Sequence, residues 1–224
     1  MLGGRARLPV LAEISGSPNG TRAWSLRRAD MGRLGEALPR LAAHQVLVAA
    51  GEGEAPIDCA IAIAAAAAAS GRRTALLECD VARPRLATVL GLQPVPGLHE
   101  YLRWEAQPAE VLQPVALGGS AAGGVTEPLV CIAAGRPAQN PSTLFGLQSF
   151  SHMSAKLRGA YGFVVVVAPP VASEPGPALE VARHADAVVA GLAAGEASGR
   201  AGRHVRTAVK RLPVPALGAI AVKQ

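Results

Sequence analysis

The chain has 224 residues, half of them hydrophobic and only 3% aromatic, and its 22 basic against 16 acidic side chains give a formal charge of +6. This length and apolar content exclude a disordered protein and leave room for one domain with a sizeable core. No apolar run approaches the roughly 18 residues of a membrane span, and the three cysteines lack the spacing of metal ligands. We therefore expect a cytoplasmic protein with reduced thiols.

The first predicted feature is a flexible tail over residues 1–20, which are rich in Gly, Pro and Ser, before a single domain over 21–224. A polar, arginine-rich helix should follow the tail. From there apolar strands alternate with helices, and this alternation is typical of a parallel sheet covered on both faces. The predicted strands are 46–50, 74–78, 129–133, 163–168 and 216–222, and the predicted helices are 57–69, 98–104, 109–112, 142–159 and 200–211.

These elements predict an α/β fold with a doubly wound, mostly parallel sheet of about six to seven strands and helices on both faces. The turn between the first apolar strand and its helix is the usual place where such folds hold phosphates, through backbone N–H groups at the helix N-terminus. A proline in this turn suits the first positions of a helix. The turn consists of Gly51, Glu52, Gly53, Glu54, Ala55 and Pro56.

This turn resembles the Walker A loop of the bacterial tyrosine kinases (BY-kinases), which are MinD/ParA-like P-loop ATPases. Further segments resemble other motifs of that family in the same order: ALLECDVARPRL (75–86), GLQPVPGLHEYLRWEAQPAEVLQP (91–114), AAGRPAQNPSTLF (133–145) and YGFVVVVAPPV (161–171). The resemblance implies a MinD-like P-loop NTPase fold. It also implies a role in exopolysaccharide or capsule biosynthesis and export, where these kinases are cytoplasmic partners of membrane-embedded polysaccharide chain-length regulators.

The chain departs from the family where the chemistry would take place. The family loop ends in Gly-Lys-Ser/Thr, whose lysine pairs with the terminal phosphates and whose hydroxyl ligates magnesium. Here Glu54 and Ala55 occupy those positions, and Val167 occupies that of the Walker B aspartate. A carboxylate about 4 Å from a phosphate oxygen repels it by roughly 4 kcal/mol at an effective dielectric of 20, where lysine would attract it by a similar amount.

A second acidic motif is only partly kept, because Glu78 replaces its first aspartate while Asp80 and Arg83 match. The adenine-reading asparagine of the last strand falls on Val222, and the tyrosine-rich tail of the family is absent. The oligomerisation motif of the N-terminal helix would map to Thr21, Trp24 and Arg27, which leaves one arginine of its pattern. We therefore expect the fold to be kept, the kinase chemistry to be lost, and neither a metal nor a nucleotide cofactor to be needed.

The resulting hypothesis is a catalytically degenerate BY-kinase-like protein, a pseudokinase that acts as a regulator or scaffold. Its expected partner is a chain-length regulator or an active kinase paralogue, which would hold it peripherally at the inner membrane; homo-oligomerisation stays open, and no specific nucleic acid is expected. Basic residues near both ends of the domain are the candidate partner surface, although the last helix equally fits a plain solvated face. These residues are Arg22, Arg27, Arg28, Arg203, Arg206 and Lys210.

Three alternatives remain open. A divergent ATPase or tyrosine kinase of the same pathway would bind ATP and magnesium through the loop N–H groups and Asp80, with Glu78 and Asp80 as a candidate acid pair. A ParA-like positioning protein would bind DNA through its basic residues. A Rossmann enzyme would place Glu78 on a ribose, but its GxGxxG pattern fails because Pro56 stands where the third glycine belongs.

Overall fold

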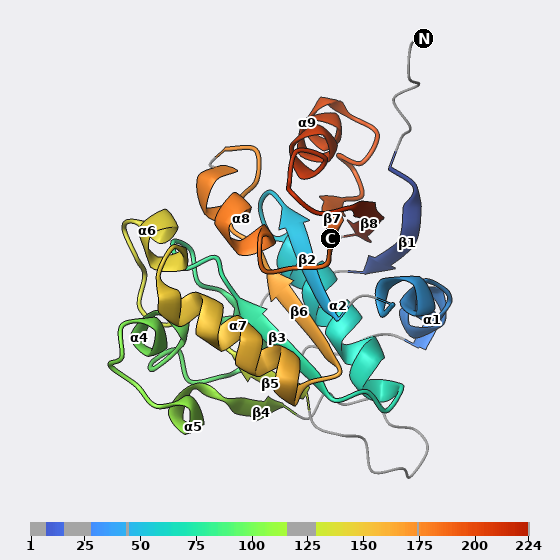
Figure 1. The fold of residues 1–224 in the computed structure, drawn as a ribbon. Coiled ribbons are helices and arrows are strands. Elements are labelled where there is room, and N and C mark those ends of the chain that lie inside the picture. Colours follow the sequence, from blue (N-terminus) through green and yellow to red (C-terminus); the bar gives the residue numbers. More distant parts are fainter. Residues whose placement is uncertain (1–7, 16–27, 44, 116–128, 174, 224) are drawn as a thin grey trace.

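The computed structural model describes residues 8–15, 28–43, 45–115, 129–173 and 175–223. Their strands form one eight-stranded sheet in the order β1-β8-β7-β2-β6-β3-β5-β4 (Figure 1). Of the described strand pairs, only β4 and β5 run antiparallel. The strands are β1 (Val10–Ser15), β2 (Val46–Gly51), β3 (Thr74–Glu78), β4 (Gln113–Val115), β5 (Leu129–Ile132), β6 (Phe163–Val167), β7 (Ala187–Ala193) and β8 (Ala216–Lys223).

Helices cover both faces of this sheet, as predicted for a doubly wound α/β fold. Their core side chains divide into two clusters, one on each face. Helices α1 (Arg28–Leu41), α2 (Ala55–Ala69) and α3 (Leu86–Leu90) pack on one face. The other face carries α4 (Leu98–Leu102), α5 (Pro108–Val111), α6 (Pro141–Phe145), α7 (Gln148–Ala160), α8 (Pro175–Ala182) and α9 (Arg200–Val209).

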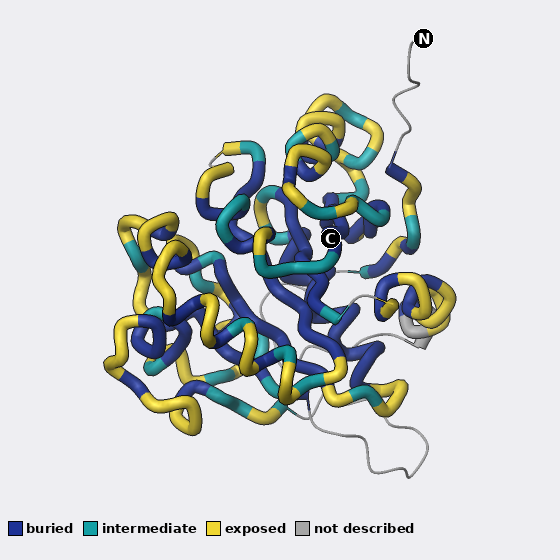
Figure 2. The backbone as a smooth tube through the Cα atoms, viewed as in Figure 1, coloured by how far each residue is buried: buried dark blue, intermediate teal, exposed yellow. Residues whose placement is uncertain are grey.

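The residues at the centre of the molecule are buried on both sides of the sheet. Strands β2, β3 and β6 are buried along their whole length, which explains why they read as continuous apolar runs instead of alternating ones. Helix α2 is apolar all round and buried almost throughout, because it lies under the middle of the sheet and beneath α1. Figure 2 shows this buried centre surrounded by exposed outer helices.

The prediction of a structureless tail over residues 1–20 is wrong for its middle part. Val10–Ser15 form β1, which pairs in parallel with β8 at the edge of the sheet, and Ile14 is fully buried there. The strand is short, and its pairing partner lies about two hundred residues away in sequence, so local composition gave no signal for it. Residues 1–7 and 16–20 lie outside the described residues.

Two other expectations also need correction. The helix expected over 142–159 is two helices, α6 and α7, because Leu147 adopts an extended backbone between them. Strands β4 and β7 were not predicted, so the described sheet has more strands than expected. Residues Ala187–Ala193 form a continuous apolar run like the other central strands, but their alanine and glycine content weakens the strand signal.

The strand order also decides between the two nucleotide-binding folds considered above. In a Rossmann half, the first and second strands are neighbours. Here β6 lies between β2 and β3, which carry the glycine turn and the acidic motif. The Rossmann alternative is therefore wrong.

Candidate functional site

The candidate site lies at the carboxyl edge of the sheet, where β2, β3 and β6 end side by side. A small pocket of about 20 Å³ opens there, with room for about one water molecule. The structure thus brings together the glycine turn, the acidic motif and the degenerate Walker B position. The lining residues include Gly51, Gly53, Pro56, Glu78, Asp80, Arg83, Arg85 and Val167.

The glycine turn is shaped by close packing between the start of α2 and the ends of β2 and β7. A Cβ atom added to Gly51 would lie 2.9 Å from Pro56 Cγ and would also overlap the carbonyl oxygen of Gly191. A Cβ atom on Gly191 would lie 2.8 Å from Pro56 Cα. Gly53 has a φ of 63°, a left-handed conformation that favours glycine. These glycines therefore hold the geometry of the turn whether or not a ligand binds.

Glu54 stands where the family has its lysine, at the N-cap of α2, yet its side chain makes no capping hydrogen bond. Its carboxylate instead forms an ion pair with the guanidinium of Arg85, and both side chains are about half exposed. Arg85 was not among the predicted site residues, because nothing in the sequence connects it with a turn some thirty residues earlier. The ion pair places the carboxylate of Glu54 next to the guanidinium of Arg85, and Arg85 lines the pocket.

Glu52 has a structural role in the same turn. One carboxylate oxygen accepts hydrogen bonds from the backbone N–H groups of Ala172 (2.6 Å) and Ser173 (3.1 Å). The other oxygen accepts one from the Ser173 hydroxyl at 3.0 Å. Glu52 therefore ties the turn to the segment that follows β6.

Glu78 is buried, with 1% of its surface exposed, and all its described hydrogen bonds come from backbone N–H groups. Oε1 accepts from Arg85 (2.6 Å) and Leu86 (2.9 Å), and Oε2 accepts from Ala134 (3.1 Å). Burial raises the pKa of this carboxyl, although the three N–H groups act in the opposite direction. Glu78 thus joins the end of β3 to the start of α3 and to the segment after β5.

Asp80 lies closer to solvent than Glu78 and has a different partner. Its Oδ1 accepts a hydrogen bond from the backbone N–H of Arg83 at 3.3 Å, and its Oδ2 lies 3.7 Å from Arg83 Nε. Burial raises the pKa of Asp80 against the opposing charge of Arg83. Asp80 and Arg83 line the pocket together with Glu78 and form the part of the acidic motif that lies nearer to solvent.

Val167 ends β6 and is buried between Ala49 of β2 and Glu78 of β3. Neither it nor Ala55 offers an oxygen atom to a metal. Within the ranges that the structure describes, no group of three or more His, Cys, Asp or Glu side chains is placed to hold a metal ion.

Of the basic residues proposed as a partner surface, the structure describes the side chains of those on and after α9. Arg22 and Arg27 lie outside the described residues, and Arg28 begins α1 without a described side chain. On α9, the half-buried Arg206 donates a hydrogen bond to the carbonyl oxygen of Ala197. Arg203 is exposed and donates to the Ser198 carbonyl oxygen at 3.3 Å, and Lys210 is exposed just after the helix.

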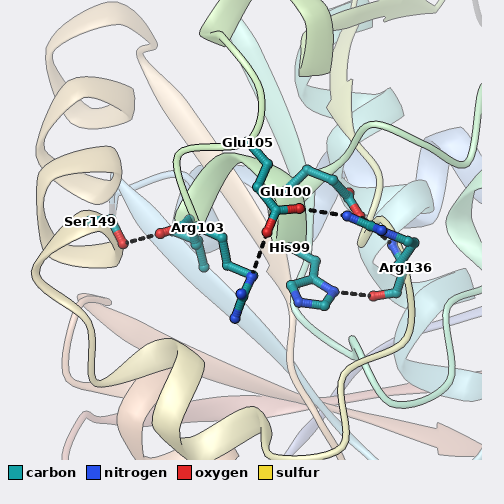
Figure 3. Close-up of polar contacts among 7 residues, drawn as sticks. His99, Glu100, Arg103, Glu105, Arg136 and Ser149 are labelled. Carbon is teal, nitrogen blue, oxygen red and sulfur yellow. Dashed lines mark hydrogen bonds and ion pairs between the residues drawn. The ribbon is translucent and has the colours of Figure 1, made fainter.

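A second polar cluster, not predicted from the sequence, lies beside α4 (Figure 3). Glu100 is buried and accepts hydrogen bonds from the Arg136 guanidinium (2.8 Å) and from the backbone N–H groups of Arg136 (3.1 Å) and Gly97 (2.8 Å). Glu105 bridges the guanidinium groups of Arg136 (2.5 Å) and Arg103 (2.7 Å). The cluster fastens α4 to the segment after β5, next to the Ala134 contact of Glu78.

This cluster predicts a pH dependence of stability. Burial acts to raise the pKa of Glu100, but the hydrogen bonds from Arg136 and Gly97 outweigh it and hold the pKa below its ordinary value. The stabilisation is therefore complete above the ordinary glutamate pKa of about 4.3 and is lost as the pH falls below it. Glu100→Gln should reduce the free energy of unfolding by about 1–3 kcal/mol at pH 7, and by progressively less as the pH falls below 4.

Urea denaturation at a series of pH values measures this difference. Glu36→Gln, at an exposed position of α1, is the matched control and should track the wild type at every pH. A Glu100→Gln penalty that stays constant from pH 7 to pH 3 would contradict the assignment.

No protein-family model matches this chain, and no curated protein matches it either. Solved structures do. The chimerical protein CapA2B2 aligns with a TM-score of 0.76 at 18% identity over 96% of this chain and 94% of that one. The kinase domain of the Escherichia coli tyrosine kinase ETK aligns with a TM-score of 0.73 at 18% identity over 97% and 91%.

A more distant match is the septum site-determining protein MinD of Pyrococcus horikoshii, whose structure is a complex with Mg-ADP. It aligns with a TM-score of 0.57 at 14% identity over 79% of this chain and 68% of that one. These similarities agree with the strand order, the glycine turn and the position of the acidic motif. The chain therefore has the P-loop fold shared by the bacterial tyrosine kinase domains and the MinD-type ATPases.

Proposed function

We propose that this protein is a catalytically degenerate BY-kinase-like scaffold of exopolysaccharide or capsule biosynthesis. The observation that carries the proposal is the ion pair between Glu54 and Arg85, whose arginine lines the site pocket. A carboxylate there replaces the lysine that P-loop enzymes use to pair with the terminal phosphates. The fold remains, while the position on which phosphoryl transfer depends has the opposite charge.

The donor set does not fit magnesium and ATP in the manner of P-loop enzymes. Magnesium needs oxygen ligands, and P-loop enzymes supply them from a Ser/Thr hydroxyl and a Walker B aspartate. Ala55 and Val167 supply none, and Val167 is buried among apolar neighbours. Losing both metal ligands and reversing the loop charge removes all three groups together, so we derive no catalytic step at this site.

The pathway and the partner are inferred from the resemblance of the motifs and from the shared fold. No helix of the described part of the chain is long and apolar enough to cross a membrane. We propose that a chain-length regulator in the inner membrane, or an active kinase paralogue bound to one, recruits this protein from the cytoplasm. The protein would then influence assembly through contacts alone.

Affinity purification from solubilised native membranes tests this proposal. We expect a chain-length regulator or an active tyrosine kinase to co-purify with the wild type. Recovery with neither of them would contradict the proposal, and salt-sensitive binding to duplex DNA would favour a ParA-like positioning role instead.

One observation favours a second candidate function, a divergent nucleotide-binding protein. Asp80, Arg83 and the left-handed Gly53 still line the pocket, so backbone N–H groups of the turn and one carboxylate remain available. Such a protein would bind ATP saturably, and Asp80→Ala would abolish that binding.

A further inference from the structure

A groove of about 1090 Å³ lies between α8, α9 and the segment after β6. It adjoins the degenerate turn, because Glu52 and Ala172 are among its lining residues. Its volume is slightly above the range of small-molecule pockets, about 300–1,000 Å³, and it is open to solvent. The groove therefore has room for several side chains of a partner.

One wall of the groove is a basic stripe formed by α9 and the turn after it. Arg200, Arg203 and His204 lie on α9, Arg211 lies in the turn that follows the helix, and all four line the groove. All four side chains belong to exposed residues. Between residues 200 and 211 the chain contains five Arg or Lys residues and no Asp or Glu, so no acidic residue within this segment offsets the positive potential of the wall.

The floor of the groove is apolar. Val171, Leu179, Val205 and Leu212 line it, and three of them belong to the hydrophobic core beneath. A highly charged, fully hydrated ligand would bury no apolar surface against this floor. A ligand with both acidic and apolar side chains would satisfy wall and floor together.

The groove also carries two acidic side chains, Glu52 and Glu196. The carboxylate of Glu52 is held by the N–H groups of Ala172 and Ser173. Acidic side chains of a ligand would be repelled near these two residues and attracted by the arginines of the basic stripe. The helix is about 15 Å long, so its stripe matches a helical partner segment of about ten residues.

We propose that this groove binds an acidic, amphipathic segment of a protein partner, with its carboxylates on the α9 stripe and its apolar side chains on the floor. The concave shape favours a peptide segment over a flat lipid surface. This inference rests on the proposed scaffold function, for which it names the chemistry of the partner's docking segment.

Fluorescence anisotropy with a defined probe tests the proposal. The probe is a fluorescein-labelled peptide of about 12 residues in which Glu and Leu follow helical spacing, and its partner probe has Lys in place of every Glu. The groove variant carries Arg203→Glu and Arg211→Glu. The control variant carries Arg40→Glu and Lys156→Glu, at exposed positions of α1 and α7, so both variants have the same net charge.

We expect saturable binding of the acidic peptide to the wild type, about tenfold or more weaker binding to the groove variant, and at most about a twofold change in the control. The lysine peptide should bind none of them. Absence of acidic-peptide binding, equal binding of both peptides, or equal weakening in both variants would overturn the proposal. A lipid result would also overturn it. In that case, phosphatidylglycerol vesicles bind the wild type but not the groove variant, and the acidic peptide binds neither. Thermal melts confirm that each variant is folded.

Failure of this inference can be separated from failure of the proposed function. If the groove variant still recovers a chain-length regulator or kinase from native membranes, the scaffold function stands and the groove is wrong as its docking site. If the acidic peptide binds in the groove but neither protein is recovered with the wild type, the groove stands and the scaffold function is wrong.

Discussion

Replacing three residues together, Glu54→Lys, Ala55→Thr and Val167→Asp, should give the protein Mg-ATP affinity at least about a hundredfold above that of the wild type. The charge reversal at residue 54 alone changes the interaction with a phosphate at about 4 Å from roughly 4 kcal/mol of repulsion to a similar attraction, and screening to less than half of this still leaves about a hundredfold. The threonine and the aspartate would supply the missing magnesium ligands. Isothermal titration calorimetry measures the affinity.

The control variants separate the effect of the loop charge on ATP affinity from the effect of the added magnesium ligands. Glu54→Ala removes the repulsion and frees Arg85 without adding a metal ligand, so it should bind far more weakly than the triple variant. Val167 is buried, so the double variant with Glu54→Lys and Ala55→Thr remains informative if the aspartate prevents folding. Equal affinity of the wild type and a folded double or triple variant would show that the loop charge does not decide nucleotide binding.

Glu78→Ala should be among the most destabilising single substitutions, at about 3–5 kcal/mol. The change leaves the backbone N–H groups of Arg85, Leu86 and Ala134 without their acceptor, and each buried unpaired donor costs about 1–3 kcal/mol. Asp80→Ala is the matched comparison, since Asp80 lies nearer to solvent and its described ion pair is with Arg83, three residues along the chain. It should cost about 1 kcal/mol or less.

Urea denaturation of both variants provides the test. If Glu78→Ala does not fold, Glu78→Gln serves in its place, because glutamine keeps one acceptor oxygen and should lose about 1–3 kcal/mol. Equal losses at positions 78 and 80 would show that Glu78 is not the structural anchor described here.

The central strands could be predicted from the sequence because each buries both faces and is bounded by turn residues. The runs at Val46–Gly51 and Phe163–Val167 are apolar without interruption, and Thr74–Glu78 has an apolar middle between Thr74 and Glu78. Edge strands lack such continuous apolar runs, so their sequences give a weaker signal. Strand β1 has only alternating burial over six residues and depends on β8 for pairing, so the sequence around it reads as a loop.

The candidate site was predictable in its positions and not in its contacts. The motifs identified the turn at Gly51 and the acidic residues Glu78 and Asp80 as candidate site residues. The role of Glu78 depends on which backbone N–H groups face it after folding, and the partner of Glu54 is an arginine from a distant segment. No local pattern encodes either pairing.

Tertiary contacts that no local pattern encodes also determine the positions of the basic side chains of α9. Helical spacing predicted Arg203, Arg206 and Lys210 on one face, but Arg206 binds the carbonyl oxygen of Ala197 in the loop before α9. Arg203 lines the groove together with Arg200 and Arg211. Arg206 thus turns toward the loop before α9, while Arg203 turns toward the groove beside α8. The geometry of that loop and the packing of α8 are tertiary properties.

We propose that this protein keeps the P-loop fold without nucleotide chemistry. Titration of the wild-type protein with ATP and magnesium in a calorimeter is the test. We expect no saturable heat at millimolar ATP and no ligand-dependent rise in the melting temperature. Saturable binding that Asp80→Ala abolishes would contradict it and would establish the divergent nucleotide-binding protein instead.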